Sequence, residues 1–189
     1  YFQSSVIDFD KDRSDRSTYK LLGGSIGFYG STLNTRQYAT KGYLEKLIAQ
    51  VFTGRERFEP GNPQEGYSPS PQERQSWLQI SYMKEAYHTM GPKFTLGWMA
   101  EALYSSKNFS ENYTATMMQA GEFAPTPHSK LMYNEAFRAN QYVAAGIKPI
   151  YVLNDMFQFR TEFYGFTPIF PIKKNALNKA YYGKAFSRF

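Results

Sequence analysis

Strict alternation of apolar and polar side chains over long segments is the feature that most limits the folds available to this chain. It is clearest in residues 93–104 and recurs in residues 156–167. Neighbouring side chains of a β-strand point to opposite faces, so each segment predicts a strand with one apolar face. The large apolar side chains of these two faces are Phe94, Leu96, Trp98, Phe157, Phe159 and Phe163.

Weaker alternation elsewhere extends the prediction to most of the chain. The segments concerned are residues 19–29, 77–87, 142–153 and 180–189. Together the segments predict about seven strands and an all-β fold, an antiparallel β-barrel or part of one. Charged or Pro- and Gly-rich stretches predict long loops, with at most one short helix near residues 131–138. These loops are residues 5–18, 59–75, about 105–140 and 170–178.

Residues 43–52 conflict with a purely β interpretation. Their apolar side chains, among them Leu44, Leu47, Ile48 and Val51, recur at helical spacing. Periodicity alone therefore favours an amphipathic helix in this segment.

Composition removes several classes of protein. The 189 residues contain no cysteine, which excludes disulfide scaffolds and Cys-ligated metals. His88 and His128 are the only histidines, so we expect no metal site and no cofactor. No apolar run approaches the roughly 18 residues of a membrane-spanning helix. We interpret residues 1–4 as the remnant of an expression tag and residues 5–189 as one β domain, a fragment of a larger barrel.

The length of the alternating segments allows two environments. A tilted membrane-spanning β-strand needs about 9–11 residues, and its sequence alternates with aromatic side chains near both interfaces. Residues 93–104 and 156–167 satisfy both conditions. A soluble barrel or sandwich that binds a lipid or another apolar ligand has the same alternation. From the pattern alone the soluble interpretation comes first, because the membrane signal of a single strand is weak.

A search for catalytic and nucleic-acid-binding residues assigns no site. Residues 23–27 match G-x-S-x-G, but this motif needs a helix directly after the serine, and no helical pattern follows Ser25. Neither histidine has an orienting partner in the sequence, so we predict no catalytic residue in this chain. The net charge of +6 comes from scattered basic residues without a phosphate-binding loop, and we expect no nucleic-acid partner.

Three short motifs between about residues 32 and 168 resemble a known family. The first is Tyr38-Ala39-Thr40-Lys41-Gly42, which resembles the aromatic-Pro-Thr-Arg/Lys-Gly turn that opens a barrel strand, with Ala39 in place of the usual proline. The second is Asn112-Tyr113-Thr114-Ala115-Thr116, followed by Phe123, Pro125-Thr126 and Ser129. The third is Phe137-Arg138-Ala139-Asn140 before residues 142–153. Together they resemble the C-terminal domain of bacterial patatin-like phospholipases, which is similar to the surface-antigen barrels of Gram-negative outer membranes.

The resemblance implies a location and a role. It implies that residues 43–52 form a strand and that this chain is a non-catalytic barrel domain in the outer membrane of a Gram-negative bacterium. The domain would hold or export an upstream lipase domain whose Ser–Asp dyad lies outside this fragment. Its partners would be membrane lipid and that lipase domain, and the six side chains of the opening paragraph would face lipid. An open sheet edge cannot face lipid unpaired, so we also expect strand pairing, for example with a second copy.

Overall fold

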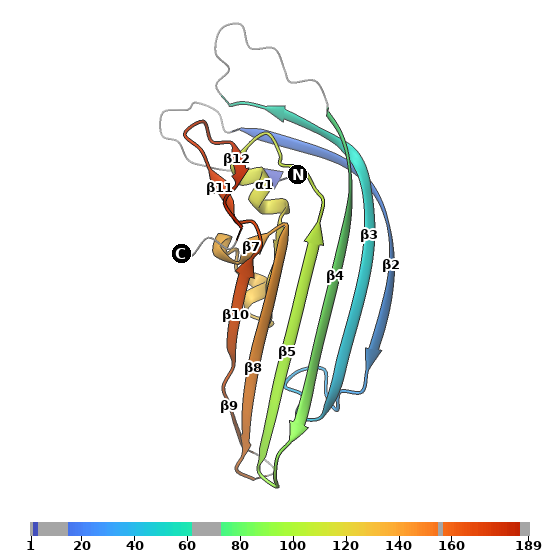
Figure 1. The fold of residues 1–189 in the computed structure, drawn as a ribbon, viewed down its shortest axis with the longest axis vertical. Helices are drawn as coiled ribbons and strands as arrows, with labels where there is room; N and C mark the ends of the chain where they lie inside the picture. Colours follow the sequence, from blue (N-terminus) through green and yellow to red (C-terminus); the bar gives the residue numbers. More distant parts are fainter. Residues whose placement is uncertain (1, 4–14, 62–72, 155–156, 186–189) are drawn as a thin grey trace, which may run out of the picture.

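The chain forms one long, curved antiparallel sheet with a smaller layer on its concave side (Figure 1). The computed structural model describes residues 2–3, 15–61, 73–154 and 157–185. Along its path the sheet contains β1 (Phe2–Gln3), β2 (Arg16–Ser31), β3 (Gly42–Glu59), β4 (Glu73–Thr89), β5 (Phe94–Ser105), β8 (Gln141–Val152) and β10 (Phe163–Pro168), with β9 (Gln158–Arg160) beside β8. The predicted all-β antiparallel class is therefore confirmed, and within the described residues the sheet does not close on itself.

The order of the strands follows the chain closely. β2 to β5 form a meander, and the sheet then continues to β8 and β10. β1 contributes two residues that pair with Arg16 and Ser17, so part of the segment interpreted as a tag joins the sheet. β4 begins at Glu73, inside the segment predicted as a loop, while the rest of that loop, residues 62–72, lies outside the described residues.

Residues 43–52 are a strand, against their helical periodicity. They lie within β3, which pairs along this stretch with β2 on one side and β4 on the other. The register places Leu47 and Val51 on the convex face and Leu44 and Ile48 on the concave face. Apolar side chains on both faces of a strand reproduce the spacing of a helical stripe, which explains the misleading pattern.

In the described part of the chain, the one α-helix lies at a different position from the short helix expected near residues 131–138. α1 (Tyr113–Gln119) begins after Asn112, whose Oδ1 accepts a hydrogen bond of 2.7 Å from the Ala115 amide. The expected segment contains instead two 3₁₀ turns, η1 (Ser129–Leu131) and η2 (Glu135–Phe137). Two short ribbons complete the fold: β6 (Gly121–Glu122) with β7 (Arg138–Ala139), and β11 (Ile172–Lys174) with β12 (Ala180–Tyr182). Among the described residues no helix is long and apolar enough to cross a membrane.

The main buried cluster lies between the sheet and residues 106–140. Phe123 packs against the rings of Tyr142, Tyr164 and Phe166, with centroids 5.8–6.3 Å apart. The other buried members are Met99, Leu103, Ala139 and Ala144. All the sheet residues of this cluster project from the concave face, so the core of the molecule lies inside the curve of the sheet.

Candidate lipid-facing surface

Five of the six side chains predicted to face lipid share one face of the sheet. In the β5–β8 register Phe94 lies opposite Tyr151, Leu96 opposite Pro149 and Trp98 opposite Ile147. Phe159 lies opposite Tyr151 and Phe163 opposite Ile147, so they belong to the same face. This is the convex face, which faces away from α1. Phe157 precedes β9 by one residue and is 63% exposed.

The convex face carries many more exposed apolar side chains than the alternating pattern identified. It includes Ile26, which is 78% exposed in β2, and Ile147, which is 51% exposed in β8. The full set of large exposed side chains on this face is Leu22, Ile26, Phe28, Tyr43, Leu47, Val51, Leu78, Ile80, Phe94, Tyr104, Val143, Ile147, Tyr151, Phe159 and Phe163. Leu96 and Trp98 lie among them and are half-buried. The apolar face therefore extends from β2 to β10.

The exposed apolar side chains that β2 and β3 add to the convex face were not identified from the sequence, for two reasons. Glycines at positions such as Gly24 and Gly30 interrupt the apolar alternation of β2. In β3 both faces carry apolar side chains, so the sequence shows no alternation that would mark the convex face. A search for one apolar face per strand that tolerated glycine would have found Leu22, Ile26 and Phe28.

Polar groups bound the apolar face toward its ends. Lys20, Arg55 and Arg74 lie side by side on the convex face beyond Leu22 and Thr53. Toward the other end Glu45 accepts a 2.6 Å hydrogen bond from Tyr82 and lies 3.8 Å from the Lys84 ammonium. From Phe94 to Tyr104 the apolar side chains of β5 span ten residue steps, which corresponds to ~34 Å of strand. Tilted by about 45°, that length covers a band about 25 Å high, as in membrane barrels.

The concave face differs from the convex one, because charged side chains are partly or fully buried on it. The Lys148 ammonium lies 2.8 Å from Glu85 and is almost fully buried. Tyr142 donates a 2.5 Å hydrogen bond to Glu101, and Tyr164 donates one of 2.6 Å to Glu162. These polar groups are paired with one another, which offsets the cost of removing them from water.

Arg160 links this network to the loop between β2 and β3. Its guanidinium lies 2.5 Å from Glu162, donates to the Tyr87 hydroxyl at 2.8 Å and reaches the Ala39 carbonyl at 3.0 Å. Ala39 is buried. Gly42, at the start of β3, has a positive φ of 93°. Ala39 of the turn motif of residues 38–42 is therefore buried, and its carbonyl is held by Arg160.

Arg138 of the third motif ties together two parts of residues 106–140, the segment on the concave face. Arg138 donates to the carbonyls of Met117, Met118 and Ala120 at the end of α1, at 3.1–3.4 Å. It also pairs with Glu122 at 2.6 Å. Helix carbonyls that would otherwise lack partners are thus satisfied by one side chain.

Ser25 does not lie on a strand-to-helix turn. It is in the interior of β2, directly opposite Gln50, and faces the concave side. His88 lies in β4 on the convex face and receives a 3.3 Å hydrogen bond from the Trp98 indole. The two residues therefore project from opposite faces of the sheet.

Comparisons with known proteins add no relative. No family model matches the chain, and no curated protein or solved structure matches it either.

Proposed function

We propose that this chain is part of the wall of an outer-membrane β-barrel and acts as a non-catalytic anchor. The observation that carries the proposal is the contrast between the two faces of the sheet. Apolar side chains such as Ile26 and Ile147 are exposed on the convex face, while charged ones such as Lys148 are buried on the concave face. Membrane barrels have this arrangement, with an apolar band outside and polar groups inside.

The same contrast argues against the soluble alternative. A soluble sandwich covers its apolar sheet face with a second layer. Here the covering layer, residues 106–140, lies on the concave face instead (Figure 1). An uncovered apolar surface extending from β2 to β10 is far larger than the patches that monomeric soluble proteins expose.

The two edges of the sheet support continuation into a ring. Within the described residues, β1 covers only Arg16 and Ser17 of β2, and the far edge of β10 has no partner strand. Every junction from β2 to β10 is antiparallel, so these two edge strands run in opposite directions. The β10 edge of one copy can therefore pair antiparallel with the β2 edge of a second copy, or with further strands of a longer parent chain.

We further propose that the barrel holds or exports an upstream lipase domain of a patatin-like phospholipase. This part rests on the resemblance of the three motifs. The turn at residues 38–42, held by Arg160, and the loop capped by Arg138 give each motif a structural role in a barrel wall. In this proposal the lipid hydrolysis belongs to the parent protein.

The chain contains two tryptophans on opposite faces, which provide a direct test of the membrane placement. Trp98 lies on the convex face and Trp77 on the concave face. The variants Trp77→Phe and Trp98→Phe each leave one reporter. In vesicles of phospholipid brominated on its acyl chains, Trp98 should lose most of its fluorescence and Trp77 should lose little.

Equal quenching of both tryptophans, or none in either, would refute the membrane placement. A chain that stays folded and monodisperse in buffer without lipid would favour the soluble alternative. The mass of the folded assembly in vesicles then distinguishes a ring of two copies from a single chain.

A further inference from the structure

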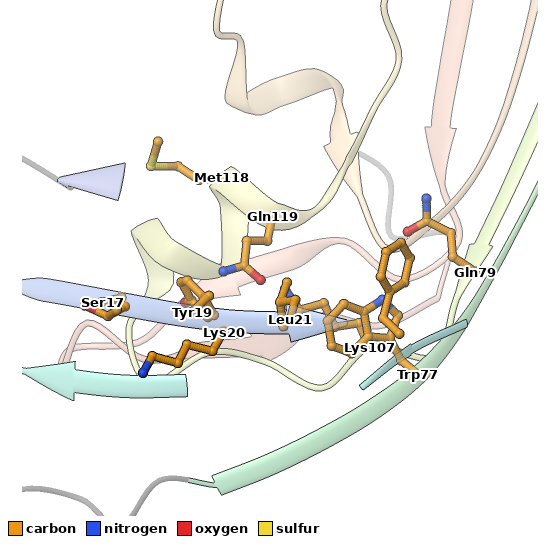
Figure 2. Close-up of a pocket in the computed structure, with 11 residues that line it drawn as sticks. Ser17, Tyr19, Lys20, Leu21, Trp77, Gln79, Lys107, Met118 and Gln119 are labelled. Atoms are coloured by element: carbon orange, nitrogen blue, oxygen red, sulfur yellow. The ribbon is translucent and has the colours of Figure 1, made fainter. Parts of the chain in front are cut away.

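A cavity of about 690 Å³ lies on the concave side between the sheet and α1. Its walls are formed by Leu21 of β2, Phe52 of β3, Trp77 of β4 and Met118 of α1 (Figure 2). The rings of Phe52 and Trp77 stack with centroids 5.1 Å apart. Its size is that of a small-molecule pocket, and such pockets combine apolar walls with a few polar groups.

One buried cation projects into this cavity. Lys107 follows β5, lines the pocket and is 8% exposed. Its ammonium lies 5.0 Å from the centroid of the Trp77 ring and 5.6 Å from that of Tyr19. Both contacts are cation–π interactions, and they hold the charge over aromatic faces at the pocket wall.

The cation has no close counter-ion among the described residues. No carboxylate there lies within 4.0 Å of the Lys107 ammonium, although Glu56 attracts it from further away. The Glu56 carboxylate accepts hydrogen bonds from the Tyr19 hydroxyl at 2.9 Å and the Glu111 amide at 3.4 Å. Burial lowers the pKa of Lys107 to about 8, so the group remains mostly charged at neutral pH.

A second polar group in the pocket has an unused acceptor. Gln119, at the end of α1, lines the same cavity, and its Oε1 is buried without a hydrogen-bond partner. A buried acceptor without a partner is costly, and a bound ligand that places a hydroxyl beside it, such as a free hydroxyl of a lysophospholipid, would satisfy it by donating a hydrogen bond.

We propose that this pocket binds a single-chain amphiphile with a monoanionic headgroup. The anionic group would pair with Lys107, a hydroxyl of a lysophospholipid headgroup would donate to Gln119 Oε1, and the acyl chain would lie against Leu21, Phe52 and Trp77. Among the described residues that line the pocket, Lys20 is exposed, so Lys107 is the one buried cation and matches a single negative charge, while the apolar walls match one hydrocarbon chain. Two sources supply this chemistry: the carboxylate of a free fatty acid and the phosphodiester of a lysophospholipid. The pocket lies on the concave side, so binding itself does not require the membrane placement of the convex face, whereas the control that reads Trp98 in vesicles rests on that placement.

Trp77 reports occupancy of the pocket. The Trp98→Phe protein, in vesicles of unbrominated zwitterionic phospholipid, is titrated with 9,10-dibromostearate, with its methyl ester, and with a lysophosphatidylglycerol that carries the same brominated chain. The Trp77→Phe protein measures quenching by amphiphile dissolved in the surrounding lipid. We expect saturable quenching of Trp77 by at least one anionic probe, and the more effective probe identifies the headgroup.

Removing the cation should weaken binding about tenfold or more, as expected for loss of a charge-assisted contact. Lys107→Met, made in the Trp98→Phe background, and the neutral methyl ester should both show this loss. Lys107→Arg retains the charge and should retain binding. Lys46→Met removes a lysine from the exposed part of the concave face and should leave the titration unchanged.

Three results would overturn the proposal. These are equal affinity in Lys107→Met, equal affinity for the methyl ester, and unsaturable quenching that matches that of the Trp77→Phe protein. Near-ultraviolet circular dichroism identifies any variant that fails to fold, and the comparison of dibromostearate with its methyl ester, which needs no substitution at Lys107, keeps the test decisive in that case.

Discussion

Replacing Ile147 with arginine measures directly what the convex face contacts. Ile147 lies near the middle of β8, between Trp98 and Phe163 in the two neighbouring strands, and is 51% exposed. An arginine there would project from the centre of the apolar face. If that face contacts lipid, the substitution places a charge near the middle of the bilayer.

The expected loss of unfolding free energy depends on how deep in the bilayer the new arginine lies. Arginine on the lipid face of a barrel costs about 2–4 kcal/mol at the midplane and about 0–1 kcal/mol near the interfaces. Leu153, in the turn after β8, is 57% exposed and provides a matched control. We therefore expect Ile147→Arg to cost at least about 2 kcal/mol more than Leu153→Arg. Leu96 lies two residues from the start of β5, so Leu96→Arg should fall between them.

The measurement is the free energy of unfolding from urea titrations in phospholipid vesicles, followed by tryptophan fluorescence. On the surface of a soluble protein, both substitutions would change stability by no more than about 0.5 kcal/mol. Equal, small effects of Ile147→Arg and Leu153→Arg would therefore refute the lipid-facing assignment.

Three further predictions use the same unfolding assay. Asn112→Ala removes the N-cap of α1 and should cost about 1 kcal/mol; no change would exclude a capping role. Lys107 has a folded pKa of about 8 against an ordinary 10.5, so the unfolding free energy of the unmutated protein relative to that of Lys107→Met should rise by about 3 kcal/mol from pH 8 to 10.5, and a constant difference would refute the lowered pKa. Gly146→Ala places a methyl group against the Tyr164 ring and should cost about 1–3 kcal/mol, whereas Gly165→Ala, which has open space, should be neutral; equal effects would contradict the packing.

The sheet was predictable from the sequence because each strand carries its own local signal. Residues 93–104 correspond to β5 within one residue at each end, and the alternation assigned Phe94, Leu96 and Trp98 to one face. The short strands β9 and β10 were merged into one segment, since alternation continues across the break at residues 161–162. The apolar–polar alternation predicts on which face of the sheet a side chain lies, but it does not predict where the pairing between two strands ends.

α1 was not predictable in this way because its stability comes from contacts distant in sequence. Its sequence, YTATMMQ, contains two β-branched threonines and no strong helical pattern. The helix depends on Asn112 before it, on Arg138 at its end, and on the burial of Met117. Arg138 is almost twenty residues further along the chain, outside any local window.

The decisive property, which face of the sheet is covered, is invisible to alternation. The same pattern describes a soluble strand with its apolar face in the core and a barrel strand with its apolar face toward lipid. Here the covering segment carries Phe123 onto the concave face, where it packs on Tyr142 beside half-buried Glu101 and the neighbouring polar pairs. That placement leaves Ile147 and Phe163 uncovered. An apolar face of this extent is stable only against something other than water, and this requirement, rather than any single motif, is the basis on which we propose a lipid environment.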